Sequence, residues 1–176
     1  MKNIKLSMFI FIFSVGNFYS QDNPLKRLDF LIGEWNGTGS GFRNQKSTIH
    51  SEFTYIMNGN YIEVMNESKF EPTDSDPEGE HHIDKGIISF DKDRQVIVFR
   101  QFNIEGYVNQ YVLDDSLSND SLFVFETEII ENFVPGGKTR WTISKNTGDR
   151  IETVFEVLFP EREYVCYGTN FLTKEN

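Results

Sequence analysis

The feature that most constrains this chain is a regular succession of strand-length segments separated by tight turns. Within a segment, apolar and polar residues alternate with a period of two; Ile49, Phe53 and Tyr55, for example, share one face of residues 47–57. Asn58 and Gly59, directly after that segment, form a strong hairpin signal. The segments cover residues 35–42, 47–57, 61–69, 82–90, 95–102, 107–113, 122–130, 139–144, 150–159 and 164–173. Their spacing predicts an all-β fold.

About ten sequential antiparallel strands do not readily form one open sheet. Large twisted sheets close into barrels or split into two packed layers. Short turns between successive strands favour an up-and-down barrel, because a sandwich usually contains longer Greek-key connections. We therefore expect an antiparallel up-and-down β-barrel of about ten strands, capped by a short N-terminal helix at residues 24–32. A barrel of this size encloses one small ligand.

The N-terminus has the pattern of a secretory signal peptide. Two lysines within residues 1–5 precede a ten-residue apolar run at residues 6–15, and small and polar residues follow up to Ser20. The apolar run is too short to span a bilayer. We expect cleavage near Ser20, export to the periplasm or the medium, and a mature barrel domain of residues 21–176 without a transmembrane segment.

The charge of the chain excludes some partners. The net charge is −10, and it becomes −12 without residues 1–20, which hold two lysines and no acidic residue. Nucleic acids are not expected as partners, because binding phosphates requires clustered Lys and Arg. The single cysteine, Cys166, cannot form a disulfide within the chain.

Polar residues within apolar strands are the candidate binding residues. In a strand His82 and Asp84 share one face while His81 points away, so the two histidines are poorly placed to bind one metal ion. No known motif for a catalytic nucleophile, a zinc hydrolase or a nucleotide site is present. The sequence therefore favours a binding protein over an enzyme.

A second concentration of polar residues spans residues 100–111. Arg100 and Gln101 lie on opposite faces of their strand, and either needs a partner because both faces carry apolar residues. An ion pair of Arg100 with Glu105 or Glu126 is one interpretation, and a role in ligand binding is the other. Asn109 belongs to a stripe with two tyrosines that lines either a wet cavity or an outer belt.

Three segments carry a resemblance to a known family. They are the Gly-x-Trp-x-Gly-x-Gly-x-Gly pattern that begins at Gly33 and includes Trp35, the His-x-Asp-x-Gly pattern at residues 82–86, and residues 100–111. In this order they resemble the nitrobindin-like haem-binding β-barrels, which are fatty-acid-binding-protein-like barrels of the wider lipocalin-like group. The third segment is most similar to a bacterial branch of that family.

The resemblance implies a ten-stranded barrel closed by a short helix, with His82 and Gln101 as pocket residues. It also implies ferric haem bound through a histidine of the last strand. That histidine is absent, because the three histidines stand at positions 50, 81 and 82. Haem would then require Tyr164, Cys166 or Tyr167 as its axial ligand, since tyrosine and thiolate both bind haem iron.

Two functions follow as hypotheses. In the first, an exported barrel encloses an apolar or amphipathic small molecule, which contacts a set of candidate residues: Trp35, His82, Arg100, Gln101 and Asn109. In the second, a haem protein with a non-histidine axial ligand acts on nitrogen oxides. A barrel that serves only as an interaction surface is a third interpretation, and the sequence does not separate it from the others.

Overall fold

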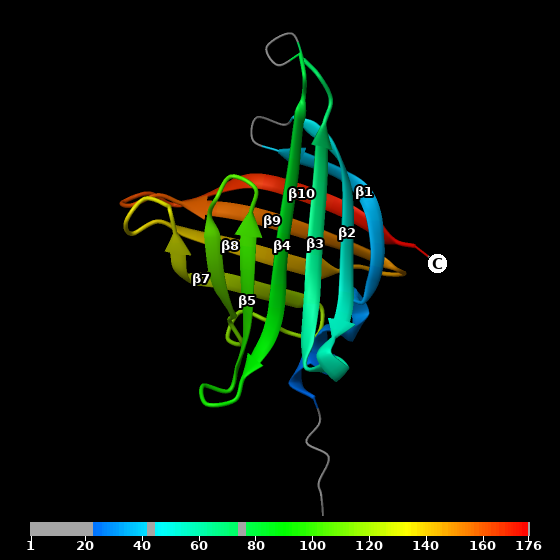
Figure 1. Ribbon diagram of the computed structural model, residues 1–176, viewed down its shortest axis with the longest axis vertical. Coiled ribbons are helices and arrows are strands. Elements are labelled where there is room, and N and C mark those ends of the chain that lie inside the picture. The colour runs from blue at the N-terminus through cyan, green and yellow to red at the C-terminus, as the bar shows by residue number, and fades with distance from the viewer. Residues whose placement is uncertain (1–22, 42–44, 74–76, 176) are drawn as a thin grey trace, which may run out of the picture.

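The protein is a closed barrel of ten antiparallel strands in sequential order, as the computed structural model shows for residues 23–41, 45–73 and 77–175 (Figure 1). The predicted signal peptide lies outside these described residues. Every strand pairs with its neighbour in sequence, and β1 closes the barrel on β10. The strands are β1 (Gly33–Gly41), β2 (Lys46–Ile56), β3 (Tyr61–Phe70), β4 (Glu80–Asp91), β5 (Val96–Asn103), β6 (Val108–Leu113), β7 (Leu122–Glu131), β8 (Lys138–Lys145), β9 (Arg150–Leu158) and β10 (Tyr164–Lys174). The predicted all-β up-and-down barrel is confirmed.

The glycines of β1 allow the barrel to close. Gly37 pairs with Leu172 of β10, and a Cβ atom placed on it would lie 1.9 Å from the carbonyl oxygen of Phe171. At Gly39 the nearest atom would be the Asn170 Oδ1, at 2.3 Å. The period-two glycines thus mark a strand face where neighbouring atoms approach closer than any side chain permits.

The N-terminal capping element is a 3-10 helix, η1 (Pro24–Leu31), and not an α-helix. Three leucines, Leu25, Leu28 and Leu31, recur at intervals of three, which is the period of a 3-10 helix, so they share one face. All three are fully buried in the core of the barrel. The short element predicted at residues 24–32 thus takes the form of a 3-10 helix, because apolar residues spaced by three favour the tighter turn here.

The end of the barrel next to η1 is filled with apolar side chains. Trp35 is buried there, and its indole Nε1 donates a 2.6 Å hydrogen bond to the carbonyl oxygen of Leu31, which fixes η1 against β1. Phe99 and Phe125 extend this core towards the middle of the barrel, with ring centroids 6.3 Å apart. Among the described residues, no helix has both the length and the apolar character needed to cross a membrane.

Candidate ligand-binding cavity

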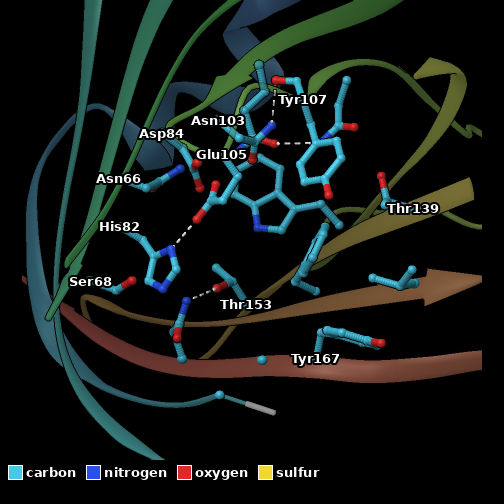
Figure 2. Close-up of a pocket in the computed structure, with 18 of the residues that line it drawn as sticks. Asn66, Ser68, His82, Asp84, Asn103, Glu105, Tyr107, Thr139, Thr153 and Tyr167 are labelled. Atoms are coloured by element: carbon cyan, nitrogen blue, oxygen red, sulfur yellow. Dashed lines mark hydrogen bonds and ion pairs between the residues drawn. The ribbon is translucent and has the colours of Figure 1, made fainter. Parts of the chain in front are cut away.

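The other end of the barrel contains a cavity of about 1030 Å³. It lies between the inward-facing side chains of the strands and the loops at the ends of β5, β7 and β9 (Figure 2). Side chains two positions apart on one strand point to the same side, so each strand contributes alternate residues to the lining. The volume is in the range that holds a drug-sized or cofactor-sized molecule.

One wall of the cavity is polar and centres on His82 of β4. The Nε2 of His82 lies 2.9 Å from a carboxylate oxygen of Glu80, and its Nδ1 contacts the carboxylate of Glu105 (Figure 2). Burial works against the charged imidazolium, but the hydrogen bonds to the two carboxylates outweigh it and raise the pKa of His82. His82 thus bridges two acidic side chains.

Asp84 lies one inward position further along β4, deeper in the cavity. It is partly buried, and its carboxylate takes part in none of the hydrogen bonds or ion pairs found among the described residues. Burial and the like charge of Glu105 raise the pKa of Asp84 to about 7, although the charge of His82 acts in the opposite direction. The structure therefore holds a carboxyl group near its titration point at neutral pH.

A hydrogen-bonded network lies at the base of the polar wall. The hydroxyl of buried Tyr111 donates to Gln101 Oε1 at 3.2 Å and accepts a hydrogen bond from Thr139 Oγ1 at 3.1 Å. The Asn109 Nδ2 donates to the Tyr111 hydroxyl at 3.1 Å and approaches Gln101 Oε1 at 3.5 Å. This leaves Asn109 Oδ1 buried without a hydrogen-bond donor, although Asn109 lines the cavity. A buried acceptor of this kind calls for a partner.

The facing wall is mainly aromatic and comes from β8, β9 and the loops at the mouth. Trp141 packs its ring 5.3 Å from that of Phe99, at the point where the cavity meets the apolar core. At the mouth, the ring of Phe133 lies 5.6 Å from that of Phe159 and 5.7 Å from that of Tyr107. The cavity is therefore amphipathic, with its charged groups on β3, β4 and the turn after β5 and a cluster of aromatic rings on β8, β9 and the loops at the mouth.

The structure brings three of the five candidate ligand-binding residues together. His82, Gln101 and Asn109 all line the cavity. Trp35 is absent from the lining, because it is packed beneath η1 in the apolar end of the barrel.

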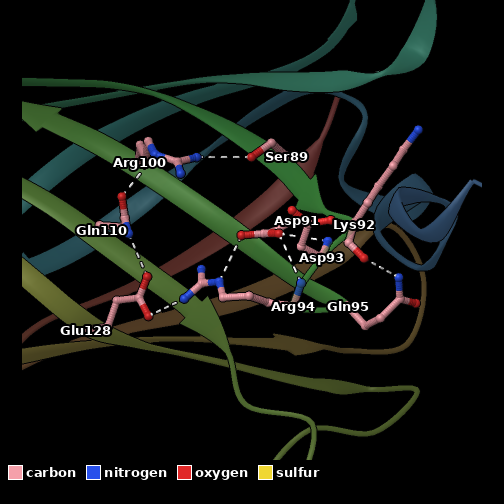
Figure 3. A network of polar contacts seen from close by, with 9 residues as sticks. All are labelled: Ser89, Asp91, Lys92, Asp93, Arg94, Gln95, Arg100, Gln110 and Glu128. Carbon is pink, nitrogen blue, oxygen red and sulfur yellow. Dashed lines mark hydrogen bonds and ion pairs between the residues drawn. The ribbon is translucent and has the colours of Figure 1, made fainter.

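Arg100 faces outward, since it neighbours the inward-facing Gln101 on the same strand. Its guanidinium donates to Gln110 Oε1 at 3.0 Å and to Ser89 Oγ at 3.2 Å on the outer surface of the barrel (Figure 3). These contacts continue through Gln110 to Glu128, which Arg94 also binds. Arg100 therefore belongs to a surface network, with neutral partners in place of Glu105 or Glu126.

Sequence reasoning did not select Asp84, Glu105 or Tyr111 as site residues. The period-two pattern contained the signal for Asp84, because it places this residue on the same face as His82. Tyr111 likewise shares a face with Asn109. Glu105 had no such signal, since it lies in the turn between β5 and β6 and reaches His82 only through the folding of that turn.

The three candidate haem ligands of β10 do not converge on one point. The Tyr164 ring lies under the Arg140 guanidinium, 3.9 Å from its carbon, on the outer side of the barrel. Cys166 is exposed and does not line the cavity. Tyr167 lies three positions beyond Tyr164, so alternation along the strand points it to the opposite side, where it faces the cavity beside Phe159. Among the described residues, no group of three or more His, Cys, Asp or Glu side chains is arranged to hold a metal ion.

Comparison with known proteins supports the fold and goes no further. No protein-family profile matches the chain, and no curated protein matches it. The crystal structure of Rv2717c from M. tuberculosis is similar with a TM-score of 0.61 and 14% sequence identity, covering 86% of this chain and 97% of that one. A redesigned beta barrel, b11L5F_LGL, reaches a TM-score of 0.41 at 10% identity over 84% of this chain and 94% of its own. The structure of EF1p2_mFAP2b bound to DFHBI has a TM-score of 0.43 and 10% sequence identity, and the match covers 85% of this chain and 97% of that one.

The likeness to Rv2717c shows a shared antiparallel β-barrel fold. At 14% identity it does not extend to function, because one fold hosts many unrelated functions. The resemblance to the nitrobindin-like family and the binding of haem stay predictions.

Proposed function

We propose that this protein is an exported carrier or receptor that holds one amphipathic small molecule inside its barrel. The observation that supports this most strongly is the cavity of about 1030 Å³ with a polar wall opposite an aromatic wall. Binding sites for small molecules combine a mostly apolar lining with a few placed polar groups that orient the ligand. The proposal assigns no catalytic residue. Export rests on the sequence pattern of residues 1–20 alone.

The cavity also presents a hydrogen-bond acceptor that a bound molecule can satisfy. Asn109 Oδ1 is buried without a donor, while its own amide nitrogen is engaged by two oxygens. An unpaired buried acceptor costs about 1–3 kcal/mol. A bound molecule with a hydrogen-bond donor removes that cost and gains affinity from it.

The residues in and around the cavity do not supply a suitable set of ligands for haem. Tyr164 and Cys166 lie outside the cavity, and both ring nitrogens of His82 contact carboxylates. Tyr167 faces the cavity, yet that cavity carries four acidic side chains, which repel the two propionates of haem. No step on haem or on nitrogen oxides is therefore proposed.

A titration with Nile red, a neutral amphipathic dye, tests the proposed function on residues 21–176. We expect saturable one-to-one binding with enhanced dye fluorescence. The Ser68→Trp variant, which places an indole in the cavity, should weaken the binding at least tenfold. Thr48→Trp on the exposed outer face of neighbouring β2 is the matched control and should bind like the wild type. Equal binding by the two variants would place the dye on the outer surface and contradict the proposal.

A further inference from the structure

The charged side chains that line the cavity are predominantly acidic. Lys and Arg are missing from the lining as far as the chain is described, and the carboxylates that line it are Glu67, Glu80, Asp84 and Glu105. Three of these groups already have basic partners within the protein. Glu67 binds Lys69 at 2.9 Å, and His82 bridges Glu80 and Glu105.

Asp84 is the carboxylate that the protein leaves without a positive partner. Its nearest charged neighbours in the cavity are Glu105, which repels it, and His82, which is already held between two other carboxylates. Desolvating a charge without pairing it is costly. A cation from outside the protein, placed beside Asp84, relieves both the desolvation and the repulsion from Glu105.

The hydrogen-bonding pattern adds a second and independent requirement. Asn109 Oδ1, whose side chain is 3% exposed, lines the same cavity and lacks a donor. The hydroxyl of its neighbour Tyr111 lies close enough to Asp84 to feel the charge of that carboxylate. Carboxylate and amide oxygen thus belong to one region of the polar wall, and N–H groups of a cation satisfy both.

The opposite wall suits the remainder of such a ligand. Trp141, Phe155 and Phe159 present rings from neighbouring strands and from the loop that follows β9. Aromatic faces bury flat apolar groups and also attract cations, with the indole of tryptophan the strongest among them. A cavity of about 1030 Å³ is far larger than a hydrated inorganic ion needs.

From these observations we infer that the ligand is an organic cation: an apolar, ring-containing body that carries a protonated nitrogen with N–H groups. The inference rests on the proposed function and names the chemical class that the cavity takes. The ammonium or amidinium group lies between Asp84 and Asn109, and the apolar body lies against the aromatic wall. Fatty acids and other anionic amphiphiles are excluded by the same carboxylates.

Three naphthalene probes of nearly equal size test the inference by isothermal titration calorimetry at about pH 8. They are 1-naphthylmethylamine (a cation at this pH), 1-naphthalenemethanol (neutral) and 1-naphthoate (an anion). We expect the amine to bind at least tenfold more tightly than the alcohol and about a hundredfold more tightly than the naphthoate. Two unlike charges about 4 Å apart in a partly buried site contribute energies of this order.

Two variants connect the selectivity to the cavity. Asp84→Asn should reduce the preference for the amine over the alcohol at least tenfold. Glu63→Gln removes the same charge from the exposed outer face of β3 and should leave the preference unchanged. If both variants lowered it equally, the net charge of the protein would be responsible, and the inference would fail.

The affinity for the amine should also depend on pH in a defined direction. Asp84 must be ionised to pair with the cation, and both its titration and that of His82 make the cavity more negative as the pH rises. We therefore expect the affinity to increase from about pH 6 to 8. A protein that binds Nile red but binds the alcohol or the naphthoate as tightly as the amine overturns this inference and leaves the proposed function intact. Failure to bind Nile red overturns the proposed function.

Discussion

Replacing Asp84 by asparagine is expected to stabilise the protein by about 4 kcal/mol near pH 8.5 and by less than about 1 kcal/mol near pH 4. The pKa of Asp84 is raised from 3.8 to about 7 in the folded protein, first by burial and then by the charge of Glu105. The unfolded chain therefore loses this proton at lower pH than the folded chain does. As a result, the contribution of Asp84 to stability falls as the pH rises from about 4 to 7 and changes little above that range.

Urea denaturation of both proteins at the two pH values measures this difference. Glu63→Gln, which alters an exposed carboxylate on the outside of the barrel, is the control and should change stability by less than about 0.5 kcal/mol at either pH. An equal gain at both pH values would show that the asparagine improves packing and would contradict the raised pKa. No gain at either pH would show that Asp84 is already paired.

This gain in stability carries a functional meaning. If Asp84→Asn stabilises the free protein and also weakens amine binding, then Asp84 serves ligand binding at a cost to the stability of the fold. A purely structural Asp84 predicts the opposite, because its removal would lower stability at neutral pH. The stability and binding measurements on Asp84→Asn therefore separate the two roles.

The second large effect concerns closure of the barrel. Gly37→Ala is expected to destabilise the protein by about 3–5 kcal/mol or to prevent folding. The new methyl group would lie 1.9 Å from the carbonyl oxygen of Phe171 and 3.0 Å from Leu172 Cα. These are backbone atoms of β10, so neither can move away without opening the β1–β10 pairing.

Two other glycines on this seam complete a graded series. At Gly39 the obstructing atoms belong to the side chains of Asn170, Ser47 and Ile49, which can move, so Gly39→Ala should cost less than Gly37→Ala. A Cβ at Gly168 meets only the Ser40 carbonyl oxygen, at an ordinary 3.7 Å, so Gly168→Ala should cost less than about 1 kcal/mol. Equal urea midpoints for all three variants would contradict the close approach of the two strands.

Strand identity and barrel closure could be predicted from this sequence because alternation records which side chains point inward. The stripe of Tyr107, Asn109 and Tyr111 illustrates both the strength and the limit of this signal. The pattern shows that the three share a face, but only the closed barrel shows that this face lines a cavity. Arg100 is the complementary case. It directly precedes Gln101 in the strand, so strict alternation already showed that the two side chains could not both line the cavity.

The remaining differences arise where local geometry departs from a regular period. The bulge after Cys166 reverses the phase of β10, so Gly168 and Asn170 line the cavity on the same side as Tyr167. Glu105 enters the site from a turn, where no periodicity applies. Trp35 occupies the apolar end because η1 supplies a carbonyl acceptor for its indole, and that contact depends on the three-residue repeat of the leucines.

The two tryptophans offer the most direct test that the cavity is the binding site. Trp141 lines the cavity, whereas Trp35 lies in the opposite end with its indole N–H bonded to Leu31. In a two-dimensional ¹H–¹⁵N spectrum titrated with 1-naphthylmethylamine, we expect the Trp141 indole signal to shift and the Trp35 indole signal to stay in place. Movement of the Trp35 signal alone, or of backbone amides confined to the outer face around Arg100, would contradict a ligand inside the barrel.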